Sequence, residues 1–114
     1  MLPYERLEVY WLAEEYLAFI DLVVQRLDRR FAWDADQLRR AAGSITYNIA
    51  EGAGDRPRGD RVRLLTYARR SASETNSVIR RLMRSGVVSA DEERVSYSYA
   101  DRISAMLWKL IRAQ

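Results

Sequence analysis

The sequence predicts an all-α fold, a single-domain antiparallel four-helix bundle with up-down-up-down topology that spans residues 1–114. Three observations support this prediction. Apolar residues recur three and four positions apart in four long segments, which is the spacing of one face of an α-helix. Short connections, most of them containing glycine or proline, separate these segments. There are no strand signals, internal repeats or low-complexity tracts.

The first helix is expected over residues 4–28, with Pro3 in the permissive first turn. Its apolar residues cover about half of the helix circumference, whereas an arc near 100° is enough for one core-facing stripe. Trp11 and Leu22 lie outside even this wide face. Two interpretations stay open: a helix deeply embedded in the bundle, or one that also serves a subunit interface. The apolar face consists of Val9, Leu12, Ala13, Tyr16, Leu17, Phe19, Ile20, Val23, Val24 and Leu27.

The second helix is expected over residues 36–52. Its core face is formed by Leu38, Ala41, Ile45 and Ile49. The opposite side carries only small residues, where a solvated face would normally carry long charged side chains. This pattern predicts that another surface packs closely against it. The small residues are Gly43, Thr46 and Ala50.

The connections carry local signals for the ends of these helices. Residues 29–34 form a connector in which Phe31 and Trp33 are expected to cover the end of the bundle. Asp34 or Asp36 is expected to cap the second helix, and Gly52 to end it in a left-handed conformation. Asp60 is the expected cap of the third helix.

The third helix is expected over residues 61–85, ending at Gly86. In the fourth, Ser89 followed by Glu92 matches a capping box, and an apolar stripe runs from Val95 to Ile111. The core face of the third helix consists of Leu64, Leu65, Ala68, Ala72, Thr75, Val78, Ile79, Leu82 and Met83.

The third helix also carries six arginines on its opposite side, within an arc of about 120°. Like charges four residues apart destabilise a helix, and Arg80 and Arg84 are such a pair. Few acidic residues are near them in sequence, so this arginine stripe is expected to meet an external anion, such as a phosphate backbone, or an acidic protein surface. The alternative is an ordinary solvated face. The stripe consists of Arg63, Arg69, Arg70, Arg80, Arg81 and Arg84.

Composition excludes several functional classes. The chain has no cysteine and no histidine, so thiolate metal sites, disulfides and the commonest general base are absent. No apolar run approaches the roughly 18 residues of a membrane span. Acidic residues interrupt the N-terminal region, so a signal peptide is not expected and a cytoplasmic location is the simplest interpretation. Net charge is −4 over residues 1–25, +7 over residues 26–84 and zero beyond.

A second polar set is a candidate active site. Glu51 and Glu74 could serve there as paired carboxylates for acid–base chemistry or metal binding. Two carboxylates alone, however, supply few of the ligands that a metal ion needs. The favoured interpretation is a hydrogen-bonded network that fixes helix register, with Arg40 neutralising a glutamate. No catalytic residue, cofactor or metal site is therefore predicted. The set consists of Arg40, Ser44, Asn48, Glu51, Ser71 and Glu74.

The segment Gln37-x-x-Arg40-Ala41-Ala42-x-Ser44-Ile45-x-x-Asn48-Ile49-Ala50-Glu51-Gly52, followed by Ala68-x-x-Ser71-x-x-Glu74, resembles a bacterial four-helix-bundle family. That family comprises the 23S ribosomal RNA intervening-sequence proteins and the accessory variability determinant (Avd-like) proteins of diversity-generating retroelements. The chain departs from it at Thr46, where proline is frequent, and at Arg70, where glycine is frequent.

The resemblance implies a homo-oligomeric ring, a pentamer, and for some relatives a reverse transcriptase and its RNA as partners. Together with the arginine stripe, it predicts a non-enzymatic oligomer that binds RNA, DNA or a nucleoprotein partner. The alternative is a structural interaction module with no nucleic-acid role, whose arginines pair with acidic residues of neighbouring subunits.

Overall fold

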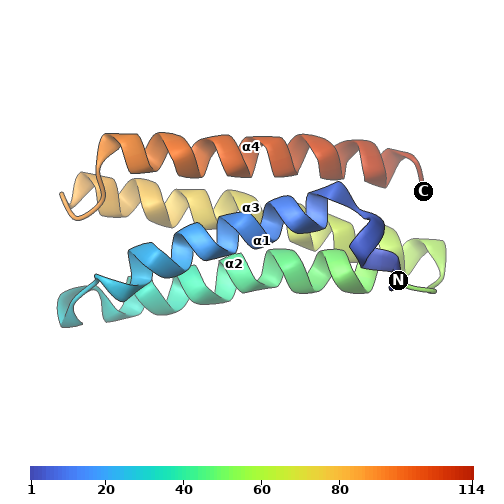
Figure 1. The fold of residues 1–114 in the computed structure, drawn as a ribbon, viewed down its shortest axis with the longest axis horizontal. Helices are drawn as coiled ribbons and strands as arrows, with labels where there is room; N and C mark the ends of the chain where they lie inside the picture. Colours follow the sequence, from blue (N-terminus) through green and yellow to red (C-terminus); the bar gives the residue numbers. More distant parts are fainter.

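The computed structural model describes residues 1–114 and contains four α-helices and no β-strand. The helices alternate in direction along a body of 43 × 23 × 22 Å, and both termini lie at the same end (Figure 1). The predicted antiparallel four-helix bundle is therefore confirmed. The helices are α1 (Glu8–Gln25), α2 (Ala32–Gly52), α3 (Arg58–Arg84) and α4 (Ala90–Arg112).

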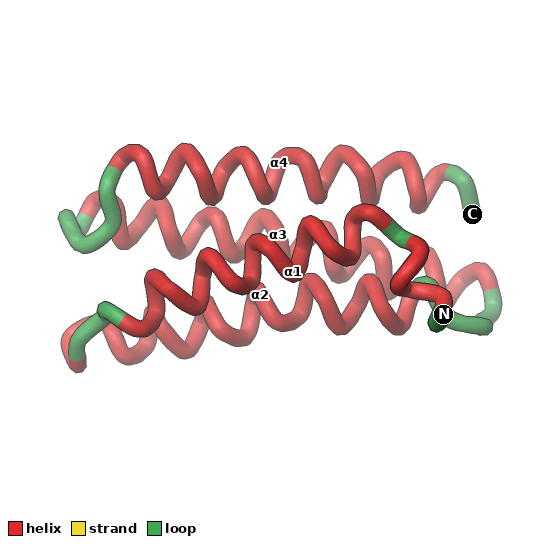
Figure 2. The backbone as a smooth tube through the Cα atoms, in the orientation of Figure 1, coloured by secondary structure: helices red, strands yellow, loops and turns green.

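Each helix packs against the next one in the sequence, and α1 also packs against α4 to close the bundle. Short connections join the helices at the two ends of the bundle (Figure 2). Each helix places a fully buried isoleucine in the common core, namely Ile20, Ile45, Ile79 and Ile103. None of the helices is both long enough and apolar enough to cross a membrane.

The first predicted helix is shorter at both ends than expected. Pro3–Arg6 form a separate 3₁₀ turn, Leu7 is extended, and α1 begins only at Glu8. The indole Nε1 of Trp11 donates a hydrogen bond to the carbonyl oxygen of Glu5, 3.0 Å away, which fastens the turn to the helix. The sequence pattern could not reveal this break because Leu7 still packs against the core.

Two predicted N-caps are wrong, because α2 and α3 begin earlier than the sequence suggested. The second helix begins at Ala32, so that Asp34 lies buried in its first turn. Asp36 lies further along the helix, where it forms an ion pair with Arg40. The third helix begins directly after Pro57, which places Asp60 in its first turn. A proline before the first turn costs no helical hydrogen bond, so the helix can extend back to it.

The two glycines expected at helix ends behave differently. Gly86 has φ +82° and ends α3 as predicted, in a conformation that glycine adopts without strain. Gly52 instead is the last residue of α2 and has no positive φ. A Cβ atom there would lie only 3.0 Å from Leu65 Cγ, so this position needs glycine for the close approach of α3.

The outer face of α1 agrees with one of the two open interpretations, and that of α2 differs from expectation. Trp11 and Leu22 are 50% and 66% exposed, so α1 is not embedded on all sides and carries an apolar outer face. On α2, Thr46 is buried within the chain, so only Gly43 and Ala50 remain of the small-residue surface that was expected to pack against another surface.

The expected role of Trp33 as a cover over the end of the bundle is wrong, because this side chain is 60% exposed.

A buried hydrogen-bonded trio links three helices. The Tyr16 hydroxyl lies 2.6 Å from Ser96 Oγ, and Ser96 Oγ donates to Asn76 Oδ1 at 3.0 Å. Tyr16 and Ser96 are fully buried, and burial raises the pKa of the Tyr16 phenol well above its ordinary value. Because every buried polar group in the trio has a partner, it fixes the register of α1, α3 and α4 at little cost.

The capping box at the start of α4 is confirmed, and a distant arginine reinforces it. Ser89 and Glu92 exchange hydrogen bonds between side chain and backbone. Arg26, just after α1, donates to both carboxylate oxygens of Glu92 at 2.5 and 2.6 Å. The Arg26 hydrogen bonds lower the pKa of Glu92 from 4.5 to about 2.

This arrangement predicts a defined acid sensitivity. Because the pKa of Glu92 is lower in the folded chain, its stabilising contribution is present above pH 4.5 and is lost as the pH falls toward 2. The Arg26 side chain is 44% exposed, so solvent screening limits the contribution to about 1 kcal/mol. Urea unfolding at several pH values should show that the unfolding free energy of a Glu92→Gln variant falls less between pH 4.5 and 2 than that of the parent protein. If the unfolding free energies of the two proteins depend on pH with the same slope, the ion pair of Glu92 with Arg26 does not cause the acid sensitivity.

Candidate nucleic-acid interface

The arginine stripe does not form one continuous site. Arg84 lies 21 positions after Arg63 on α3, which corresponds to about 31 Å along the helix. Arg63 lies near the start of the helix, where it forms an ion pair with Asp60 at 3.3 Å. The structure therefore divides the stripe into one arginine at this end, a central pair, and a group of three at the other end.

The central pair packs on exposed aromatic rings. Arg69 Nε donates to Ser104 Oγ at 2.9 Å, and its guanidinium lies 5.1 Å from the centre of the Trp108 ring. Arg70 lies 6.0 Å from the centre of the Tyr67 ring and has no acidic partner. Both contacts lie within the usual range of cation–π interactions.

The distal group contains Arg80, which is held from behind by a buried carboxylate. Its Nε and Nη2 atoms donate to Glu93 Oε1 at 3.1 and 2.8 Å. The Glu93 side chain is 11% exposed, whereas that of Arg80 is 47% exposed. The inner edge of this guanidinium is therefore bound to α4, and its outer edge faces solvent.

Arg81 is held more loosely, toward α2. Its Nε lies 3.5 Å from Asp34 Oδ1, and its guanidinium lies 5.4 Å from the centre of the Trp33 ring. Asp34 Oδ1 is buried and makes no hydrogen bond, so this ion pair is its only compensation. The Arg81 side chain is 65% exposed.

These contacts correct one premise of the sequence prediction. The stripe is not free of acidic partners, because Arg63, Arg80 and Arg81 each pair with one. Two of those partners, Asp34 and Glu93, come from other helices and are far away in the sequence. Arg69, Arg70 and Arg84 have no acidic partner; Arg69 is held by Ser104 and Trp108, whereas Arg70 and Arg84 form no hydrogen bond within the chain.

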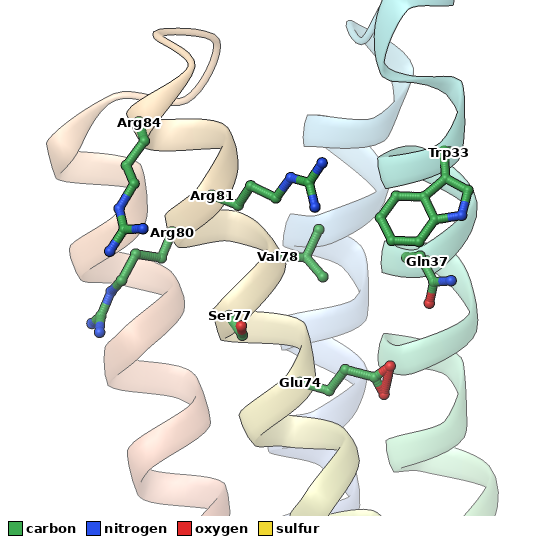
Figure 3. Close-up of a pocket in the computed structure, with 8 residues that line it drawn as sticks. All are labelled: Trp33, Gln37, Glu74, Ser77, Val78, Arg80, Arg81 and Arg84. Atoms are coloured by element: carbon green, nitrogen blue, oxygen red, sulfur yellow. The ribbon is translucent and has the colours of Figure 1, made fainter.

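The distal group borders an open groove between α2 and α3, with a volume of about 490 Å³. Figure 3 shows Arg81 and Trp33 facing each other from the two helices, with Glu74 extending toward Gln37 below them. Arg80 and Arg84 point away from Trp33, over the other side of α3. We call this site the Trp33 groove; it is lined by Trp33, Gln37, Glu74, Ser77, Val78, Arg80, Arg81 and Arg84.

In the candidate active site, hydrogen bonds join only some members of the polar set. The Ser71 hydroxyl donates to Ser44 Oγ at 3.0 Å, and the Asn48 side-chain amide donates to the same atom at 2.8 Å. The Ser71–Ser44 bond links α3 to α2, as expected for a network that fixes register, whereas the Asn48–Ser44 bond lies within α2. The predicted role of Arg40 is wrong, because it pairs with Asp36 rather than with a glutamate.

Glu51 and Glu74 are not paired. Ser44 meets Ser71 and the two helices are antiparallel, so Glu51 and Glu74 are displaced from that contact in opposite directions, by seven and three residues. The resulting separation along the bundle is about 15 Å. Glu51 pairs with Arg56, and Glu74 makes no polar contact within the chain. No group of three or more potential metal-ligating side chains is present.

Sequence reasoning missed three participants in this surface: Trp33, Asp34 and Glu93. For Glu93 a signal existed, since it lies three and seven residues before the buried Ser96 and Ala100 and so shares their face of α4. Asp34 and Trp33 gave no such signal, because their contacts with Arg81 depend on how α2 and α3 are rotated against each other.

Comparison with known proteins gives the same fold and adds a family. Comparison with curated proteins gave no match. The chain is similar to a crystal structure of a protein with unknown function from the S23 ribosomal protein family of Bacteroides thetaiotaomicron, with 22% identity and a TM-score of 0.84. The match covers 90% of this chain and 97% of the other, and at this identity it supports the fold alone. The sequence model of the 23S rRNA-intervening sequence protein family matches residues 5–109, and the chain therefore belongs to this family.

Proposed function

We propose that this protein is a non-enzymatic, self-associating bundle that binds nucleic acid, or a nucleoprotein partner, through the arginine-rich surface of α3. The observation that carries the proposal is the distal group, in which Arg80, Arg81 and Arg84 gather on the α3 side of the Trp33 groove. The carboxylates that hold two of these arginines are buried, so the exposed side of the group presents guanidinium groups.

Such a surface suits a phosphate backbone. A guanidinium group offers several N–H donors in a plane and can bind two phosphate oxygens at once. Each phosphate contact displaces counterions, so affinity falls as salt concentration rises. Binding of this kind depends little on base sequence.

Self-association is supported by the outer face of α1, where Trp11, Ala18 and Leu22 are exposed at helical spacing. Aromatic and aliphatic residues on a surface are typical anchors of protein interfaces. In the ring that the family resemblance implies, a pentamer, each subunit would contribute its own arginine surface. Repetition of a weak patch raises overall avidity for a long polyanion.

The alternative function is a structural interaction module with no nucleic-acid role. The observation that favours it is the acidic character of the same α1 face, where Glu8, Glu15 and Asp21 are exposed. In this alternative, these residues of one subunit pair with the arginine stripe of the next, and the uncompensated charges of Arg70 and Arg84 are satisfied within the oligomer.

A titration with fluorescent single-stranded RNA at about 50 and 200 mM salt separates the two functions. We expect salt-sensitive binding that weakens in an Arg70→Ala/Arg84→Ala variant, in which the slope of log affinity against log salt falls by about 0.7 for each phosphate that is no longer bound. These arginines are chosen because neither holds a buried carboxylate. Arg102→Ala is the matched control, since Arg102 is an exposed, unpaired arginine on α4.

Light scattering of each variant completes the experiment. A double variant that keeps its mass but binds RNA weakly supports the proposal. Absence of RNA binding at low salt removes the nucleic-acid role, and dissociation of the double variant into smaller species favours the structural module.

A further inference from the structure

The Trp33 groove contains a flat aromatic ring that is largely exposed. The guanidinium of Arg81 faces this ring from the other wall, 5.4 Å from the ring centre. Gln37 of α2 and Glu74 of α3 line the groove below Trp33 from its two walls (Figure 3), and neither side chain forms a hydrogen bond within the chain. The groove therefore combines a stacking surface with unused hydrogen-bonding groups.

A planar ligand fits between Trp33 and Arg81 after a small movement. Stacked bases in a nucleic-acid strand are about 3.4 Å apart, so a base between two flat groups needs roughly 7 Å. The guanidinium of Arg81 now lies 5.4 Å from the ring centre. Its ion pair with Asp34, at 3.5 Å, is longer than a hydrogen bond, and the side chain is 65% exposed. Outward movement of Arg81 breaks no hydrogen bond, but it lengthens the ion pair that compensates the buried Asp34 Oδ1, and stacking of the base has to offset this cost.

The second tryptophan–arginine pair on the surface is less suitable. Arg69 is fixed over Trp108 by its hydrogen bond to Ser104, and Arg112 also lies 5.7 Å from the centre of the same ring. A ligand would have to displace a hydrogen-bonded arginine or compete with a second one. This comparison favours the Trp33 groove as the stacking site.

Glu74 limits which base fits. A carboxylate can only accept hydrogen bonds, and it has two oxygens side by side. Among the four bases, guanine alone presents two adjacent N–H donors, N1–H and the N2 amino group, on its Watson–Crick edge. The other bases place an acceptor beside their donor, which would face the negative charge. The Gln37 amide adds a donor for the O6 atom of guanine.

We propose that the Trp33 groove binds one unpaired guanine nucleotide, with its base stacked on Trp33 and its Watson–Crick edge toward Glu74 and Gln37. Arg81 covers the base and, with Arg80 and Arg84 beyond it, meets the neighbouring phosphates. This inference rests on the proposed nucleic-acid binding and adds to it a preferred base and a defined place for that base.

The test compares short oligouridines that carry one central guanosine, adenosine, cytidine or uridine, titrated at low salt. We expect the guanosine oligomer to bind about tenfold more tightly than the others, which is the scale of discrimination by one bidentate hydrogen-bonded base contact. Trp33→Ala should remove this difference, and Trp33→Phe should retain much of it because a flat ring remains. Glu74→Gln should reduce the preference for guanosine while general binding persists.

Tyr47→Ala is the control for loss of an exposed aromatic residue. Tyr47 is 72% exposed on the same helix, about 21 Å from Trp33, and no arginine covers it. Binding and base preference should be unchanged in this variant. Circular dichroism and light scattering establish that each variant is folded and has the same mass.

The outcomes separate this inference from the proposed function. Salt-sensitive binding with no base preference, or with a preference that Trp33→Ala leaves intact, overturns the guanine site and leaves the proposed function standing. If no oligomer binds at low salt, both fail. A change of oligomeric mass in Trp33→Ala would show that Trp33 anchors a second copy, and this also overturns the guanine site.

Discussion

Replacing Ser96 by alanine is expected to lower the free energy of unfolding by about 2–4 kcal/mol. The Ser96 hydroxyl lies between Tyr16 and Asn76, at 2.6 and 3.0 Å, and all three side chains are buried. Its removal leaves the Tyr16 hydroxyl and the Asn76 amide oxygen without partners in a place that water does not reach. Leaving a buried polar group unpaired costs about 1–3 kcal/mol, and here two groups are affected. Urea denaturation measures the loss.

Ser98→Ala is the matched control on the same helix, because Ser98 is exposed and makes no hydrogen bond. This variant should be as stable as the parent or slightly more stable, since alanine is the better helix former. A Tyr16→Phe change made on top of Ser96→Ala should then cost little or even recover stability, because the unpaired hydroxyl is removed as well. Equal stability of the Ser96 and Ser98 variants would contradict the account of the trio.

Gly52→Ala is expected to lower the free energy of unfolding by about 1–3 kcal/mol, although alanine normally stabilises helices. The added Cβ would lie 3.0 Å from both Cγ and Cδ2 of Leu65 and 3.4 Å from Leu64 Cβ. Leu65 is itself almost fully buried, so its side chain cannot turn away into solvent. Leu65 or the backbone of α3 must therefore shift by a few tenths of an ångström at this end of the bundle. Thermal and urea unfolding both measure the effect.

Gly59→Ala provides the comparison, because a Cβ atom at Gly59 meets nothing within 4 Å. Since Gly59 lies in the first turn of α3, alanine should leave stability unchanged or raise it by up to about 1 kcal/mol. If both glycine variants gain stability, the close approach of α2 and α3 at Gly52 is not tight in solution.

The helices could be predicted because their determinants are local and repetitive. The apolar spacing around Leu38 and Ile45 defined one buried face, and both residues are fully buried. Gly86 and the Ser89–Glu92 pair act over only a few residues, so their roles at helix ends were also visible in the sequence. The late start of α1 and the early start of α2 were not visible, because the indole of Trp11 and the burial of Asp34 act through contacts that the local pattern does not encode.

The candidate site was predictable only in part, for a related reason. Helical spacing placed the six arginines on one side of α3, but it gave no information on what the neighbouring helices present to them. The pairings of Arg80 with Glu93 and Arg81 with Asp34 depend on the rotation and axial offset of α4 and α2. The same is true of Trp33, whose place opposite Arg81 turns a charged surface into a groove with an aromatic wall.

The attachment of Arg80 to Glu93 has an entropic consequence. A free arginine side chain samples many rotamers, and immobilising one costs up to about 2 kcal/mol. Folding has already restricted Arg80, since two of its nitrogen atoms are bound to a carboxylate fixed in α4. An anion that reaches its outer edge therefore meets a group whose disorder was largely removed beforehand. A change that loosens the packing of α4 therefore restores the rotamer freedom of Arg80. It weakens anion binding even where the altered residue lies far from the anion.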